Sequence, residues 1–179
     1  YKQLNSCIGN YAILLSPFEK ILASRASAEK VTWTDQLVQA FDDLKKAVIN
    51  PKAITVPRRE DRLITSSDYS KAKSAIGGLL TIIRTDDKGK ETKHLGGHYS
   101  AILDKNQAKW LACECEALAV KEVLKHFEPE IRNSDHTTTH ECDNMPTVLA
   151  WRKMLTGKFS SNARITMFLS SLASHPVRL

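Results

Sequence analysis

The first fifty residues carry apolar positions at a spacing of three to four, which is typical of helices with one buried face. The pattern predicts a helix over Tyr11–Ala26, in which Pro17 marks a break or a first turn. A second helix is expected to begin after the N-cap Thr34 and to end at Asn50-Pro51. Because no polar side chains converge in this part of the pattern, we expect both helices to serve packing alone.

The next part of the chain reads as extended segments rich in β-branched residues. It predicts strands over Asp61–Ser70, Ala75–Thr85 and Thr92–Leu103, and the polar stretch Asp86–Lys90 fits a hairpin loop between the last two. Two glycine pairs within these strands indicate bulges or a close backbone approach: Gly77-Gly78 and Gly96-Gly97.

The stretch Lys109–Phe127 predicts a helix with one irregular position. At about 100° per residue, Glu116 falls at the centre of the apolar stripe, whereas Glu114 falls on the opposite face, toward water. A carboxylate among apolar side chains is costly unless its charge is compensated. Glu116 is therefore either a buried residue satisfied by a hydrogen bond or an Arg partner, or a catalytic or metal-binding acid.

The remaining residues predict alternating strand and helix. Residues 135–143 are expected to form a strand, Asn144 begins a helix, residues 161–173 form another helix, and the final residues 175–179 resemble the opening of a strand. Antiparallel strands followed by strand–helix alternation predict an α+β domain, in which helices pack on a mixed sheet.

Composition narrows the class of protein only slightly. The formal charge of +6 suits a nucleic-acid partner, although many unrelated soluble domains are as basic. No apolar run is long enough for a membrane span, so no membrane partner is expected. The chain begins with Tyr1 and not Met, and we interpret it as a piece of a longer polypeptide.

The four cysteines are expected to be reduced, buried thiols in an intracellular setting. No CxxC pair is present. A zinc site built from Cys113, Cys115, His140 and Cys142 is an alternative, but the spacing of these residues matches no zinc pattern.

Three acids stand where strands end or a helix faces the sheet: Asp68, Glu116 and Asp143. Ligands in such sheets gather at strand ends, and carboxylates placed together repel one another unless a cation intervenes. An all-oxygen set suits Mg²⁺, and two such ions can clamp the oxygens of a phosphodiester. Each acid also has a structural explanation, since Asp68 could be a turn residue and Asp143 a helix cap.

Several stretches occur in an order that resembles a known family. They are SPFEKIL, VTWT, AFDDLKKAV, LITSSDYSKAKSAIGGLL, WLACECEALAVKEVLKHF and HECDNMP. In this order they resemble the pol polyprotein of LTR retroelements, from the tail of the reverse transcriptase into its ribonuclease H domain. HLGGHYSAIL and GKFSSNARITMFLSSL are most similar to the Pao-like branch, with gypsy-like elements next.

The resemblance implies an α+β, ribonuclease-H-like fold over residues 54–179, incomplete at the C-terminus, after a helical remnant of the thumb or connection over residues 1–50. It implies cleavage of the RNA strand of RNA·DNA hybrids with two Mg²⁺ ions, Mn²⁺ being possible. Asp68 would serve both ions, and Glu116 and Asp143 one each. Glu114 matches an acid that is not a metal ligand in the family. The polymerase's own catalytic aspartate pair is absent.

Departures from the family pattern concern the residues around the acids. Ser67 and Cys142 replace the usual Thr before the first and third acids, and Asn144 replaces the usual Ser or His after the third. The family's fourth acid would lie beyond Leu179.

The implied partners are an RNA·DNA hybrid, the upstream polymerase domain and the downstream integrase, in a cytoplasmic particle or the nucleus. Basic residues could contact the nucleic-acid backbone or could be solvated surface charges: Lys71, Lys73, Arg152, Lys153 and Arg164. A different class of function also fits the sequence: a catalytically dead or host-retained domain that binds nucleic acid or connects its neighbours.

Overall fold

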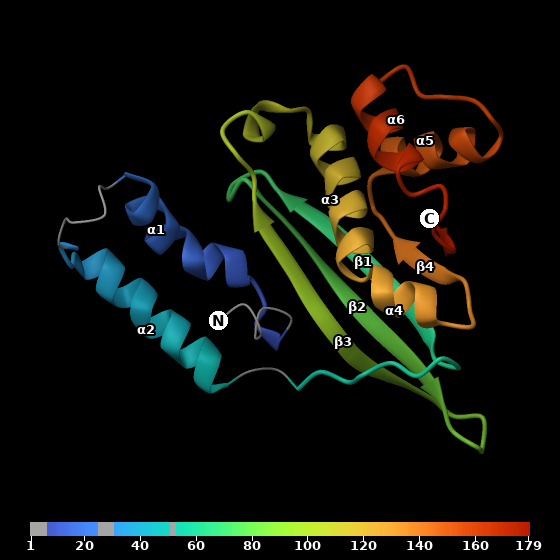
Figure 1. Ribbon diagram of the computed structural model, residues 1–179, viewed down its shortest axis with the longest axis horizontal. Helices are drawn as coiled ribbons and strands as arrows, with labels where there is room; N and C mark the ends of the chain where they lie inside the picture. Colours follow the sequence, from blue (N-terminus) through green and yellow to red (C-terminus); the bar gives the residue numbers. More distant parts are fainter. Residues whose placement is uncertain (1–6, 25–30, 51–52) are drawn as a thin grey trace.

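The computed structural model describes residues 7–24, 31–50 and 53–179. Its centre is a five-stranded mixed sheet in the order β3-β2-β1-β4-β5 (Figure 1). Strands β1 (Arg62–Ser70), β2 (Ala75–Thr85) and β3 (Glu91–Ile102) are antiparallel neighbours, whereas β4 (Thr138–Glu141) runs parallel to β1 and β5 (Val177–Arg178) parallel to β4. The predicted α+β mixed sheet is confirmed.

Four helices follow the antiparallel strands. The central helix α3 (Ala112–His126) is preceded by a short 3-10 turn, η2 (Gln107–Lys109), and packs on β1 and β2. Helix α4 (Glu128–Asn133) continues from its end, and α6 (Ala163–Ser170) contacts both α3 and α5 (Met145–Leu155). The core lies between α3 and the sheet, where Leu80, Val123 and Leu124 are fully buried.

The two helices of the N-terminal segment lie on the side of β3 that faces away from α3 (Figure 1). Helix α1 (Tyr11–Ser24) packs against β3 and against α2 (Asp35–Ile49). The backbone N–H of Ala12 donates to Ser100 Oγ at 2.9 Å, whereas the next residue back, Tyr99, contacts the ring of His126 in α3. Since successive strand residues point to opposite faces, α1 and α3 lie on opposite faces of β3.

Both glycine pairs mark the features that the sequence predicted. A Cβ on Gly78 would lie 2.4 Å from Val123 Cγ2 and 2.6 Å from the carbonyl oxygen of Ser66, so α3 can approach the sheet only at a glycine. The register of β2 and β3 shifts between Leu80 and Thr81, opposite Gly96, which is the predicted bulge.

The prediction that Pro17 breaks or begins the first helix was wrong, because Pro17 lies inside α1. An interior proline costs roughly 3 kcal/mol. We attribute its tolerance here to the packing of α1 on β3 and α2. The predicted helix end at Ala26 and the stop at Pro51 lie outside the described residues.

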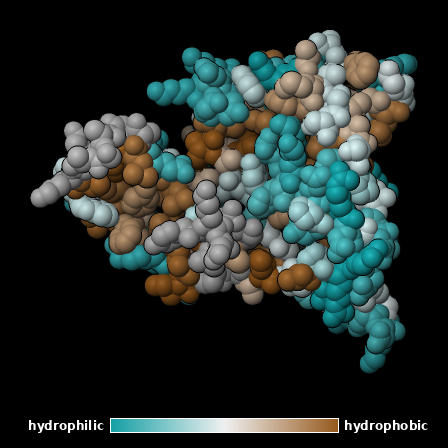
Figure 2. Space-filling model, in the orientation of Figure 1, coloured by the Kyte–Doolittle hydropathy of each residue, from teal (hydrophilic) through white to brown (hydrophobic). Residues whose placement is uncertain are grey.

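Hydrophobic side chains gather over α1 and α2 (Figure 2). Leu22 is 77% exposed, and Trp33 and Phe41 are also exposed although their rings are in contact. Among the described helices, none is both long and apolar enough to span a membrane.

Candidate active site

Two of the three predicted acids lie at the C-terminal ends of neighbouring parallel strands. Ser66 of β1 stands opposite Glu141 of β4, so Asp68 and Asp143 each follow two residues beyond this pair. Both carboxylates are exposed and line one hollow of about 490 Å³. This hollow is also lined by β2 and β3 residues and by Gly9 and Asn10, which precede α1.

The third acid, Glu116, lies on α3 and does not line this hollow, but its charge interacts with those of Asp68 and Asp143. Glu116 is partly buried, and its Oε2 atom is buried without a hydrogen-bond partner among the described residues. Burial, followed by the negative charges of Asp143 and Asp68, raises the pKa of Glu116 to about 7, and the backbone N–H of Tyr69 offsets only part of this rise. Glu116 therefore sits within the electrostatic reach of both other acids, and we name the three the acidic site.

A buried histidine joins β1, which carries Asp68, to β4, which ends two residues before Asp143. His140 Nδ1 lies 2.9 Å from Thr65 Oγ1, and His140 Nε2 lies 3.0 Å from Ser67 Oγ. Burial lowers the pKa of His140 to about 4, so the ring is neutral near pH 7. Because hydroxyls occupy both ring nitrogens, this arrangement gives no support to the zinc alternative.

The prediction that Glu114 faces water was wrong. Its side chain is only 9% exposed, because α6 packs over the first turn of α3. Burial raises the pKa of Glu114, but hydrogen bonds from Asn162, from the N–H of Leu111 and from Arg164 outweigh it and hold this pKa below its usual value. The helical pattern correctly placed Glu114 on a different side of α3 from Glu116. It could not show that α6 covers that side.

The predicted basic contacts fall into two groups. Lys71 and Lys73 lie exposed in the turn after Asp68, and Arg152 and Lys153 are exposed on α5. Arg164 differs, since it forms an ion pair with Glu114 at 2.8 Å. A role in nucleic-acid binding stays a prediction for all five.

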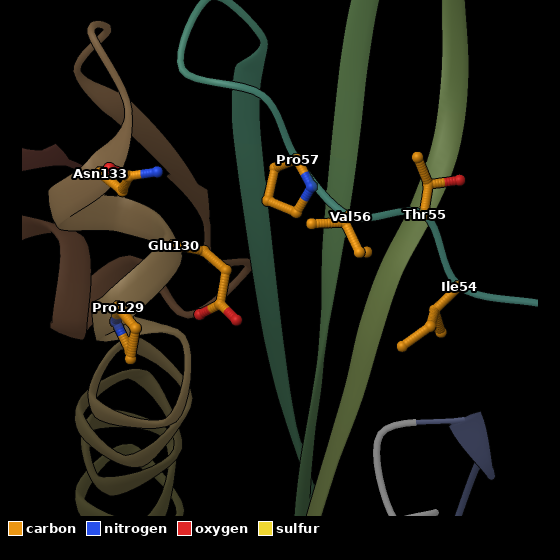
Figure 3. Close-up of a pocket in the computed structure, with 8 residues that line it drawn as sticks. Ile54, Thr55, Val56, Pro57, Pro129, Glu130 and Asn133 are labelled. Carbon is orange, nitrogen blue, oxygen red and sulfur yellow. The ribbon is translucent and has the colours of Figure 1, made fainter.

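A second hollow, of about 480 Å³, lies away from the acidic site between the segment before β1 and helix α4 (Figure 3). Its walls include Val56, Pro57 and Pro129, and the carboxyl group of Glu130 lies between them. None of the three predicted acids lines this hollow, so it is not the candidate site.

The three carboxylates of the acidic site are oxygen ligands of the kind that Mg²⁺ takes in proteins. Within residues 7–24, 31–50 and 53–179, no group of three or more His, Cys, Asp or Glu side chains is arranged to hold one ion. Mg²⁺ needs only one or two carboxylates and takes its other ligands from water and phosphate. The unpartnered oxygen of Glu116 and the mutual repulsion of the acids are the features that a cation would relieve.

The mixed sheet with its packed helices is the fold of ribonuclease-H-like domains. The sequence profile described as "RNase H-like domain found in reverse transcriptase" matches residues 33–139, and the chain belongs to this family. The match confirms the predicted relationship to reverse transcriptases, and it includes α2, the strands β1 to β3 and the first two residues of β4.

Curated relatives agree with this assignment, and solved structures agree with the fold. The Tf2-3 and Tf2-4 transposon polyproteins of Schizosaccharomyces pombe are 27% identical over 95 residues, which is 53% of this chain and 7% of each relative. A foamy viral protease-reverse transcriptase in complex with dsDNA superposes with a TM-score of 0.68 at 11% identity, over 98% of this chain and 34% of that one. The same viral protein with an RNA/DNA hybrid gives 0.68 at 12% identity, over 98% and 22%.

Proposed function

We propose that this domain cleaves the RNA strand of RNA·DNA hybrids, and that Asp68, Glu116 and Asp143 hold the metal ions that the reaction needs. The observation that carries the proposal is the state of Glu116, which is a partly buried carboxylate with an unpartnered oxygen beside two other acids. Such a group destabilises the fold unless a ligand or a proton compensates its charge. Perturbed carboxyl groups of this kind cluster at functional sites.

Each acid has a distinct part in the proposed site. Asp68 would contribute to both ions, and Glu116 and Asp143 would each complete the ligand set of one. When bound, two Mg²⁺ or Mn²⁺ ions supply the positive charge that stabilises the attacking and leaving oxygens of the phosphodiester. Water would attack the phosphorus in line and leave a 3′-hydroxyl and a 5′-phosphate.

The proposed substrate and partners follow the relatives. One solved neighbour is described in complex with an RNA/DNA hybrid, and the curated relatives are polyproteins. This chain spans 7% of those relatives, so we propose that a polymerase domain and an integrase flank it in the parent protein. The exposed cations Lys71, Lys73, Arg152 and Lys153 would neutralise phosphates of the hybrid.

The direct test is cleavage of a labelled RNA strand annealed to DNA, with Mg²⁺ and with EDTA, by protein extended beyond Leu179 to include the family's fourth acid. Glu116→Gln keeps the shape of the side chain and removes its charge, and we expect it to lower the rate by about 100-fold or more. Glu130→Gln is the matched control, because Glu130 also has a buried, unpartnered oxygen but lies in the other hollow.

Two results would reject the proposal. Equal cleavage by the wild type and Glu116→Gln would remove Glu116 from the site. Tight hybrid binding by the wild type without Mg²⁺-dependent cleavage would instead support a domain that binds nucleic acid and connects its neighbours.

A further inference from the structure

Glu114 lies two residues before Glu116, on the same turn of α3, and is held at several points. Its Oε2 atom accepts hydrogen bonds from Arg164 Nη1 at 2.8 Å and from the backbone N–H of Leu111 at 3.0 Å. Its Oε1 atom accepts from Asn162 Nδ2 at 3.1 Å. The carboxyl group is thus bound to the start of its own helix. It is also bound to Asn162 and Arg164, which lie 48 and 50 residues away in the chain.

The partners of Glu114 are themselves fixed. The guanidinium carbon of Arg164 lies 4.2 Å from the centre of the Trp110 ring, just before α3 begins. Asn162 caps α6, since its Oδ1 atom accepts from the backbone N–H groups of Arg164 and Ile165. The Glu114 cluster, made of Trp110, Glu114, Asn162 and Arg164, therefore joins the beginning of α6 to the beginning of α3.

Glu116 has less support, since the backbone N–H of Tyr69 is the one hydrogen-bond donor that lowers its pKa. Its Oε2 atom has no partner within the described residues, and its neighbours Asp68 and Asp143 repel it. Two residues on a helix point about 200° apart, so the two acids lie on different sides of the same turn. The position of the Glu116 carboxylate therefore depends on how firmly this turn of α3 is held.

We propose that Glu114 is a positioning residue, which fixes the first turn of α3 through Arg164 and Asn162 and so aims Glu116 at Asp68 and Asp143. This role explains why an acid that is not part of the acidic site is buried beside it. The inference rests on the proposed function for its effect on metal binding, but its structural part does not.

The first test needs neither metal nor cleavage. Hydrogen exchange is measured at the amides of Glu116 and Ala117 in the full chain, as wild type and as Glu114→Gln. Loss of the ion pair is expected to speed exchange at these amides about tenfold or more relative to the rest of α3. Unchanged exchange would overturn the proposal, whatever the protein's activity.

The matched control is Asp61→Asn. Asp61 is 2% exposed and is held in the same way, by Arg84 at 2.7 Å and by the backbone N–H of Arg58 at 2.8 Å, but at the opposite end of β1 from Asp68. This variant is expected to destabilise the fold without changing exchange at Glu116.

The second test is a double-mutant cycle on Mn²⁺ affinity. Glu114→Gln is expected to weaken Mn²⁺ binding about tenfold in the wild-type background, as for other residues that orient a ligand. In the Glu116→Gln background the same change should have no further effect, whereas Asp61→Asn should change affinity in neither background. Additive losses would mean that Glu114 supports the fold alone and would overturn the proposal.

The outcomes separate the two proposals. If the wild type binds Mn²⁺ through Glu116 but does not cleave a hybrid, the proposed function fails and the role of Glu114 stands. If Mn²⁺ binding does not depend on Glu116, the metal site fails, and the exchange measurement alone decides the role of Glu114.

Discussion

His140 Nε2 lies 3.0 Å from Ser67 Oγ, and Ser67 is the residue before Asp68. The other ring nitrogen is bound to Thr65, so one histidine of β4 spans two inward-facing residues of β1. This contact fixes the parallel register of the two strands, which in turn brings Asp68 and Asp143 to the same end of the sheet. A residue outside the acidic site thus determines the spacing of two of its members.

Replacing His140 tests this arrangement. His140→Ala should leave the hydroxyls of Thr65 and Ser67 buried without partners, and we expect a loss of roughly 2–5 kcal/mol in the free energy of unfolding, from the lost volume and hydrogen bonds. Urea unfolding followed by circular dichroism measures it. A loss below 1 kcal/mol would show that the ring is not a significant link between the strands.

The protonation of His140 makes a separate prediction. Its pKa is about 4 in the fold and near 6.5 in the unfolded chain, so only the unfolded chain takes up a proton as pH falls through this window. The histidine's contribution to stability is complete above pH 6.5 and declines by about 3 kcal/mol toward pH 4. The stability difference between wild type and His140→Gln should therefore shrink as pH falls from 7 to 4.

The titration of Glu116 should change the stability of the fold with pH in the opposite direction from that of His140. Its pKa is about 7 in the fold against an ordinary value of 4.5, so the stability associated with its neutral form is complete below pH 4.5 and is lost as pH rises through 7. Without metal, Glu116→Gln should be more stable than the wild type at pH 8, by up to about 3 kcal/mol, and equally stable at pH 4. Thermal unfolding at both pH values measures this, and a destabilised Gln variant at pH 8 would contradict the account.

The close approach of α3 to the sheet can be tested at two adjacent glycines. Gly78→Ala would place a Cβ 2.4 Å from Val123 Cγ2 and 2.6 Å from a backbone oxygen, and we expect it to cost about 1–3 kcal/mol. At Gly77 the nearest contact of a Cβ is an ordinary 3.5 Å, so Gly77→Ala is the control. Equal stability of the two variants would mean that α3 is not held as close as described.

Much of the fold could be predicted because its signals are local. Thr34 caps α2 by accepting from the N–H of Leu37, and Asn144 caps α5 by accepting from the N–H of Thr147, as their positions before apolar runs indicated. The segments rich in β-branched residues and the polar turns that bound them likewise placed each of the three antiparallel strands to within a residue or two. Glu116 was singled out because it interrupts an apolar stripe.

The remaining features depend on partners that are distant in the chain. Arg164 is 50 residues from Glu114, and Ser67 is 73 residues from His140, so no local pattern pairs them. The spacing of apolar residues also did not predict α4, because a helix of six residues does not complete two turns. Sequence spacing identifies chemistry that is local to one element, whereas contacts between elements appear only in the folded chain.

The central claim is that Asp68, Glu116 and Asp143 share one cation-binding place, and paramagnetic line broadening by Mn²⁺ tests it most directly. In amide NMR spectra of the wild type, traces of Mn²⁺ should broaden the signals of residues 68, 116 and 143 together and before all others, and Glu116→Gln should require more Mn²⁺ for the same effect. Broadening that begins around Glu130, or that reaches the three acids independently of one another, would contradict the account.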